Sequence, residues 1–302
     1  MEGRAHTAIP DRARNGLRHV VNAIAVRLGV EGKVDAAIAL VEAALAADGL
    51  PIRDPEGRRC FATLLTTFAH LIDDAGRTED AIAVSRRVKG LVGPADASVA
   101  GCCSHNLSFM LASCGRHVEA LREADGAIRA RKKVVAEDET NGMRRRELGG
   151  SLRAKAEIFV ALGRRDSAAK IYGHAAEEMR TASLQEPTSE VRLALADTLS
   201  DSAVNLALLG RRADALGALE ESGAIYSPLA AAFPGHLIRH MSVLALVIGV
   251  PEQSRPGPEL RHSWRCGHET IAEIRDTWGV LASGTSPGRR VLTSVGLRWK
   301  FA

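Results

Sequence analysis

Five glycines recur in similar surroundings, and they constrain the fold more than any other feature of the chain. Gly32, Gly76, Gly115, Gly163 and Gly210 are each followed by Lys or Arg, and alanine stands five residues after every one of them. The residue seven positions before each glycine is small, and the residue four positions before it is apolar. Agreement at several fixed offsets in five segments predicts an internal repeat.

The residue types around the glycines indicate a helical hairpin in each repeat. A glycine at the end of a helix takes up the left-handed backbone conformation at little cost. Acidic residues follow within a few positions, as Asp35 and Asp214 do, and acids are favourable in the first turn of a helix. Small residues on both sides of the turn allow two helices to approach closely. One such hairpin cannot bury its apolar face alone, so the sequence predicts an all-α solenoid of stacked antiparallel helix pairs.

Composition agrees with a helical repeat and excludes several other classes of protein. The chain has 302 residues, 46% of them hydrophobic but only 4% aromatic, so its core must consist of aliphatic side chains and alanine. This excludes a disordered chain, a disulfide scaffold and a bundle of membrane-spanning helices. The five cysteines form no CxxC pair, and the N-terminus has no apolar signal-peptide core. Both observations predict a reduced, cytoplasmic protein.

Three runs of sequence resemble the tetratricopeptide repeat (TPR) family. They are LGRRADAL at 209–216, AGRTEDAI at 75–82 and CGRHVEAL at 114–121. The spacings between successive glycines are 44, 39, 48 and 47 residues, longer than the standard TPR period, so the chain is similar to the long-repeat branch that includes kinesin light chains and many bacterial proteins. The resemblance implies a right-handed superhelix that serves as a non-catalytic scaffold or sensor, here in a bacterial regulatory or signalling pathway.

We expect three segments along the chain. Residues 1–15 form an N-terminal extension, residues 16–250 form the solenoid with about five repeats and a partial sixth, and residues 251–302 form a divergent tail. The apolar stretch 241–250 is predicted to be a core helix, and 268–278 a short helix. The tail holds all three tryptophans, and its last residues, 288–302, are consistent with either a β-like segment or disorder.

No motif of catalysis, nucleotide binding or metal binding is present. The only Gly-Lys pair, Gly32-Lys33, lies inside a repeat turn without the rest of a phosphate-binding loop. Cys102 and Cys103 lie near His105, but successive helical positions point in different directions, so buried, unreactive cysteines are the simpler interpretation. The tail residues His262, Cys266 and His268 do not match a zinc pattern. The sequence therefore predicts no enzyme, no cofactor and no metal.

The resemblance also implies a binding site, because the first helices of TPR pairs line a concave groove that holds a partner peptide. The repeat register places a set of mostly polar residues toward this groove: His19, Asn22, Thr66, His70, Cys102, His105, Asn106, Phe109, Arg153, Glu157, Asp197 and Ser200. Asn106 stands where chaperone-binding members have a clamp asparagine, but Ala23, Thr67 and Ala154 occupy the equivalent places in other repeats. A clamp for carboxylate-ended chaperone tails is therefore not expected.

Clusters of basic residues leave a second possibility open. They lie at 86–89, at 129–133 and at 144–146, and an acidic run at 137–139 separates the last two. A solvated helix surface explains them most simply, because opposite charges are close by. The alternative is a nucleic-acid-binding helical repeat, although no aromatic residues interleave with the clusters. We expect a protein or peptide partner, with nucleic acid unlikely and no membrane; the sequence does not predict the oligomeric state.

Overall fold

The structure is a computed structural model that describes residues 11–47, 54–92, 96–229 and 232. Within those residues it contains α-helices, a short 3₁₀ segment at Ser227–Leu229 and no strand. The α-helices are α1 (Asp11–Val30), α2 (Val34–Ala47), α3 (Pro55–Asp74), α4 (Thr78–Leu91), α5 (Ala97–Ser113), α6 (His117–Glu137), α7 (Gly142–Ala161), α8 (Arg165–Gln185), α9 (Ser189–Leu208) and α10 (Arg212–Tyr226). The all-α prediction is confirmed.

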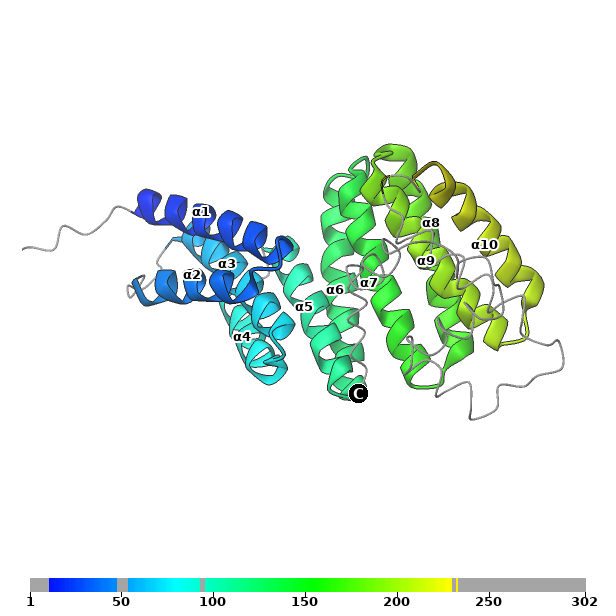
Figure 1. The fold of residues 1–302 in the computed structure, drawn as a ribbon, viewed down its shortest axis with the longest axis horizontal. Helices are drawn as coiled ribbons and strands as arrows, with labels where there is room; N and C mark the ends of the chain where they lie inside the picture. Colours follow the sequence, from blue (N-terminus) through cyan, green and yellow to red (C-terminus); the bar gives the residue numbers. More distant parts are fainter. Residues whose placement is uncertain (1–10, 48–53, 93–95, 230–231, 233–302) are drawn as a thin grey trace, which may run out of the picture. The chain divides into compact units, whose positions relative to one another are not determined.

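The chain forms two compact units, divided between Val134 and Val135. In the first unit the helices are paired as α1 with α2, α3 with α4, and α5 with the greater part of α6 (Figure 1). In the second unit α7 pairs with α8 and α9 with α10. The first helices of successive pairs also contact each other, as do α1 with α3 and α7 with α9. Each unit is therefore a stack of helix pairs, as predicted for a solenoid.

Every predicted repeat glycine lies at the turn inside a helix pair. Gly32, Gly76, Gly115, Gly163 and Gly210 have φ values of 76°, 82°, 74°, 73° and 77°, and they are the positive-φ residues of the described chain. The basic residue after each glycine donates its backbone N–H to the carbonyl of the apolar residue five positions before it, for example Arg77 to Ile72 at 2.9 Å. This is the Schellman arrangement, which satisfies carbonyls at the end of the first helix. The next helix begins one residue later.

The small residues at the fixed offsets form the contact between the two helices of each pair. The alanines five positions after the glycines, Ala37, Ala81, Ala120, Ala168 and Ala215, all have a relative exposure of 0%. The residues seven positions before the glycines, Ala25, Ala69, Ser108, Ala156 and Ala203, have exposures of 0% or 1%. Larger side chains complete the core around them, such as Leu206 and Leu219 in the last pair. The predicted close approach of the helices is confirmed.

The helix boundaries differ in places from those expected from sequence. Helix α1 begins at Asp11, so four residues of the expected extension before Asn15 are helical. Helix α3 begins at Pro55, inside a stretch marked by Pro and Gly residues at 49–57. There the Asp54 carboxylate accepts a hydrogen bond from the Gly57 N–H at 2.6 Å, and this N-cap together with Pro55 in the first turn starts the helix early. The partial sixth repeat, the helices expected at 241–250 and 268–278, and the tail lie outside the described residues.

Candidate protein-binding face

The first helices of the first unit share one side that is open to solvent. Helices α1, α3 and α5 pack in sequence, and on each of them residues three to six positions apart are exposed or half-buried. We call this surface the first-helix face of residues 11–134. It consists of His19, Ala23 and Val26 on α1, Thr63, Thr67 and His70 on α3, and Cys102, Asn106 and Phe109 on α5. None of these nine residues is an acid, a lysine or an arginine.

An exposed aromatic pair marks the α5 part of this face. The ring of Phe109 is 40% exposed and meets the ring of His105 edge to face, with centroids 5.0 Å apart and an interplanar angle of 80°. Helix α5 brings them together because they are four residues apart. The backbone carbonyl of His105 also accepts a hydrogen bond from the buried Ser108 hydroxyl at 2.6 Å. The pair therefore offers a large apolar surface next to a polar ring, on a firmly packed helix.

On α3 the predicted groove residues divide into an exposed one and a buried one. His70 is exposed, and its Nε2 lies 3.8 Å from the Asp74 carboxylate, one turn further along. Thr66 is 8% exposed, and its hydroxyl donates to the Ala62 carbonyl at 2.8 Å within the same helix. His70 can therefore contact a partner, whereas Thr66 is part of the core. The other threonines of α3, Thr63 and Thr67, are half-buried, and neither was among the expected groove residues.

Helix α1 contributes two more of the expected residues. His19 is exposed, and its Nε2 lies 3.1 Å from the Sγ atom of Cys60 on α3. Asn22 is half-buried, and its Oδ1 is buried without a hydrogen-bond partner in the described structure. Burial and the nearby Glu56 carboxylate raise the pKa of the Cys60 thiol, so this Cys–His contact does not favour a reactive thiolate.

In the second unit, the polar residues predicted to line the groove form ion pairs with one another. Arg153 on α7 contacts Glu157 at 3.1 Å in its own helix and Asp201 on α9 at 2.6 Å. The side chains are only 21%, 16% and 16% exposed. Burial of the Arg153 guanidinium lowers its pKa, but Asp201, Glu157 and Asp197 outweigh this effect and leave the pKa raised. Arg153 is therefore a fixed cation that joins two first helices.

The remaining expected residues of the second unit are also engaged. Asp197 accepts a hydrogen bond from the hydroxyl of Tyr226, which is 1% exposed on α10, at 2.7 Å. Ser200 has an exposure of 0%, and its hydroxyl donates to the Ala196 carbonyl at 3.0 Å. Ser200 is thus a core residue. Sequence reasoning missed Asp201 and Tyr226; the signal for Asp201 was its position four residues after Asp197, on the same side of α9.

The burial of Cys102 and Cys103 agrees only in part with the prediction. Cys103 is buried, and its thiol contacts the Ser85 carbonyl at 3.2 Å. Burial and the neighbouring Cys102 raise the pKa of Cys103 to about 12. The expectation of burial is wrong for Cys102, which is exposed because it lies on the first-helix face while Cys103 points into the core between α5 and α4.

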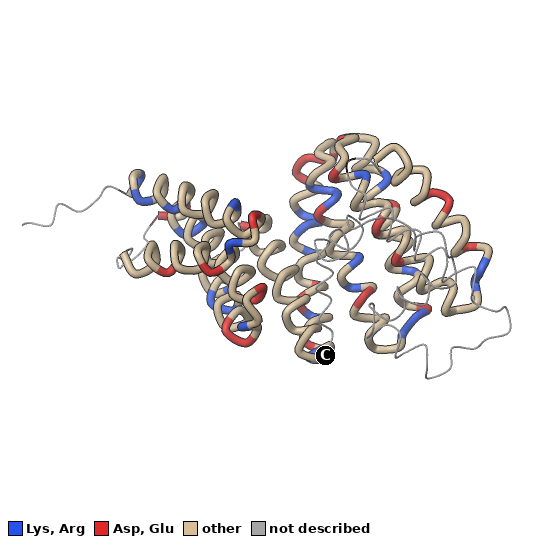
Figure 2. The backbone as a smooth tube through the Cα atoms, in the orientation of Figure 1, with Lys and Arg blue, Asp and Glu red and all other residues tan. Residues whose placement is uncertain are grey.

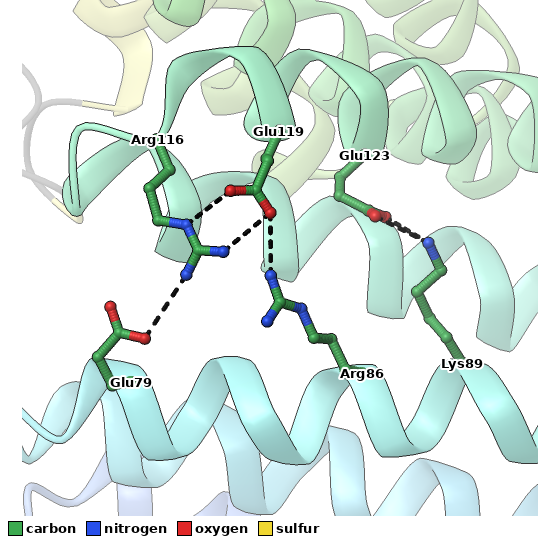
Figure 3. Close-up of polar contacts among 6 residues, drawn as sticks. All are labelled: Glu79, Arg86, Lys89, Arg116, Glu119 and Glu123. Carbon is green, nitrogen blue, oxygen red and sulfur yellow. Dashed lines mark hydrogen bonds and ion pairs between the residues drawn. The ribbon is translucent and has the colours of Figure 1, made fainter.

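Two of the three predicted basic clusters are largely ion-paired with neighbouring helices. Figure 3 shows Arg86 and Lys89 of α4 with Glu119 and Glu123 of α6, at 2.9 and 2.7 Å. Arg116 joins the same network through Glu119 at 2.8 Å and Glu79 at 3.6 Å. In the third cluster, Arg144, Arg145 and Arg146 contact Glu137, Glu178 and Glu190. Basic and acidic residues accordingly alternate over the helices in Figure 2, as a solvated surface requires.

The described residues offer no other chemistry. No group of three or more His, Cys, Asp or Glu side chains in them is arranged to hold a metal ion. The Gly32-Lys33 turn is a repeat turn, and Lys33 Nζ binds Glu31 at 2.8 Å. None of the described helices combines the length and the apolar character needed to cross a bilayer. The tail residues His262, Cys266 and His268 lie outside the described part.

Solved structures with the same fold are TPR-like repeat proteins. The repeats attributed to a kinesin light chain of Podosopora anserina align with a TM-score of 0.52 and 17% identity, over 74% of this chain and 99% of that chain. BtubC (BKLC) from P. vanneervenii aligns with a TM-score of 0.53 and 14% identity, over 81% of this chain and 86% of that chain. No protein-family model and no curated protein matches the sequence. The chain thus has the fold of TPR-type repeat proteins, as the sequence predicted.

Proposed function

We propose that the protein is a non-catalytic scaffold that binds a peptide or protein segment on the first-helix face of residues 11–134. The observation that carries this proposal is a surface of nine exposed or half-buried residues on three adjacent helices that has no formal charge and includes Phe109, 40% exposed. Stacked helix pairs present extended surfaces of this kind, and aromatic side chains in such surfaces supply much of the energy of protein binding.

The chemistry of the face suggests what would bind there. Thr67, His70 and Asn106 can donate and accept hydrogen bonds with a peptide backbone, while Phe109 and Val26 offer apolar contact. A peptide without a strong net charge fits this surface better than a polyanion. The second unit is a poorer site, because Arg153, Glu157 and Asp201 already satisfy one another and are at most 21% exposed.

A peptide selection with the full chain tests the proposal. Peptides from a displayed random library are selected on the protein, synthesised with a fluorescent label and titrated by anisotropy. We expect Phe109→Ala combined with His70→Ala to weaken binding by about ten-fold or more, because both are large exposed rings of the face and lie on adjacent helices. The matched control is Val118→Ala on α6, which removes a 63%-exposed apolar side chain from another surface of the same unit.

Two results would overturn the proposal. One is a library that yields no peptide with a measurable affinity, and the other is a set of peptides whose binding changes equally in the face variant and in the Val118→Ala control. Circular dichroism and a thermal melt of each variant show whether its fold is intact.

The nucleic-acid alternative receives less support. Arg86, Lys89 and the arginines at 144–146 bind carboxylates of their own chain, so the clusters at 86–89 and 144–146 are less available to a phosphate backbone. The nucleic-acid alternative predicts that an oligonucleotide competes with the selected peptides and that its binding falls steeply with salt. A cytoplasmic location and a role in a bacterial pathway remain predictions of the same proposal.

A further inference from the structure

One group of exposed basic residues is concentrated on a single helix and forms no ion pair in the described structure. Helix α6 carries Arg122, Arg129, Lys132 and Lys133, all exposed and none in an ion pair with the described residues. The spacings of seven and four residues place Arg122, Arg129 and Lys133 along one side of the helix, and Lys132 lies at the edge of that side. At about 1.5 Å per residue, the stripe from Arg122 to Lys133 is roughly 16 Å long.

The balance of charge along this side of α6 is positive. Asp125 lies within the stripe, so four cations and one carboxylate leave a net charge of +3. The other acids of α6 reduce it only in part. Glu119 interacts with Arg122 but is held by Arg116 and Arg86, Glu123 is held by Lys89, and Glu137 lies 3.6 Å from Arg144. A local excess of charge with no internal partner raises the concentration of opposite charge around it.

The repeat itself shows that these cations are not required by the fold. Arg122 and Arg129 stand seven and fourteen residues after Gly115. The same positions are Ala83 and Gly90 in α4, and Gly217 and Ala224 in α10. Small neutral residues therefore suffice at these positions in α4 and α10, whereas α8 has Lys170 and Glu177 there. The repeat does not require cations at these positions.

We propose that this cationic stripe of α6 binds an acidic peptide segment of a protein partner. Its length matches about five residues of extended chain, at roughly 3.3 Å per residue, and three or four carboxylates would neutralise it. Nucleic acid fits less well, because the four cations of the stripe lie on one helix and no exposed aromatic side chain accompanies them to stack on bases. The stripe is distinct from the first-helix face, so the scaffold would hold two partners of different chemistry.

Binding of a labelled hexaglutamate peptide to the full chain tests this proposal by fluorescence anisotropy at an ionic strength of about 0.15 M, where the Debye length is roughly 8 Å. The variant Arg122→Gln, Arg129→Gln, Lys132→Gln, Lys133→Gln is expected to lose at least about ten-fold in affinity. The matched control is Arg12→Gln, Arg87→Gln, Lys170→Gln, Arg192→Gln, which removes the same charge from exposed residues on four other helices. We expect the control to change the affinity by less than about two-fold, because scattered charges are screened.

The possible results separate the proposal from its rivals. An equal loss in both variants means that only net charge matters and overturns the stripe, as does the absence of hexaglutamate binding to the unaltered protein. If a single-stranded oligonucleotide of equal charge binds the stripe more tightly than hexaglutamate does, the proposal of an acidic peptide is overturned in favour of nucleic acid. Neither set of substitutions touches the first-helix face, so peptides selected on that face must bind both variants normally if that site is independent.

Discussion

The first-helix sides of the two units have the same place in the repeat but different chemistry. In residues 11–134 this side carries Thr, Asn, His and Phe side chains that are open to solvent. In residues 135–229 it carries Arg153, Glu157, Asp197 and Asp201, which bind one another or Tyr226. The repeat register decides which residues share a side of a helix. Whether that side is free for a partner depends on whether its polar groups find partners within the chain.

The strongest test of this comparison removes the positive charge of Arg153 from the second unit. Arg153→Leu leaves Glu157 and Asp201 close together and mostly buried without a counter-charge, and we expect a loss of about 2–4 kcal/mol in the free energy of unfolding. Urea denaturation followed by circular dichroism measures it. His70→Leu on the exposed side of the first unit should cost less than about 0.5 kcal/mol.

A second change distinguishes charge repulsion from lost packing in the Arg153 variant. Adding Glu157→Gln and Asp201→Asn to Arg153→Leu should restore part of the lost stability, because the repelling carboxylates are then neutral. If the triple variant is no more stable than the single one, packing of the arginine side chain explains the loss, and the electrostatic description of this side is wrong.

The Tyr226 contact should have a smaller effect. Tyr226→Phe removes the hydroxyl that donates to Asp197 at 2.7 Å from a buried ring, so we expect a loss of about 1–2 kcal/mol. Hydrogen exchange measured by mass spectrometry should show faster exchange in α9 and α10 and no change in α1 to α5. Faster exchange throughout the chain would contradict the assignment of this bond to the second unit.

Replacing a turn glycine should cost the same stability in both units, because the units differ in the side chains of their first helices and not in the backbone of their turns. Gly115→Ala and Gly163→Ala each force a residue with a Cβ to a φ near 74°, at an expected cost of about 1 kcal/mol. Gly173→Ala is the control: it lies inside α8, nothing lies within 4 Å of the added Cβ, and it should gain about 0.5 kcal/mol or more. Unequal losses at the two turns would show that they carry different strain.

The sequence predicts the fold well and the free surface only in part. The turns and the buried alanines follow from local backbone conformation and close packing, which the glycines and small residues specify directly. Thr66 and Ser200 were expected on the binding side and are buried, because a small hydroxyl can bond to its own helix and pack inside. The pairing of Arg153 with Asp201 joins residues 48 positions apart, which no local pattern encodes. Free and paired cations likewise look identical in the sequence.

The smallest expected effect concerns Cys103, whose thiol lies in the core of the first unit. Its pKa is raised to about 12 in the folded protein, from 9.0 for an ordinary thiol, so the folded state keeps the proton that the unfolded state loses. This group therefore stabilises the fold fully below pH 9, and its contribution is lost as the pH rises from about 9 toward 12. We expect Cys103→Ala to remove about 1 kcal/mol of the fall in stability between pH 8 and 10.

Thiol labelling checks the same residue independently. In a Cys266→Ser background, the exposed Cys102 and Cys114 should react with a disulfide reagent within minutes, whereas the buried Cys60 and Cys103 should wait for the first unit to open. All four of these cysteines belong to residues 11–134, so the slow labelling rate reports the opening of that unit alone. Arg153→Leu should leave this rate unchanged if the two units open separately. A faster rate in that variant would mean that loss of the Arg153 ion pairs in the second unit also destabilises the first.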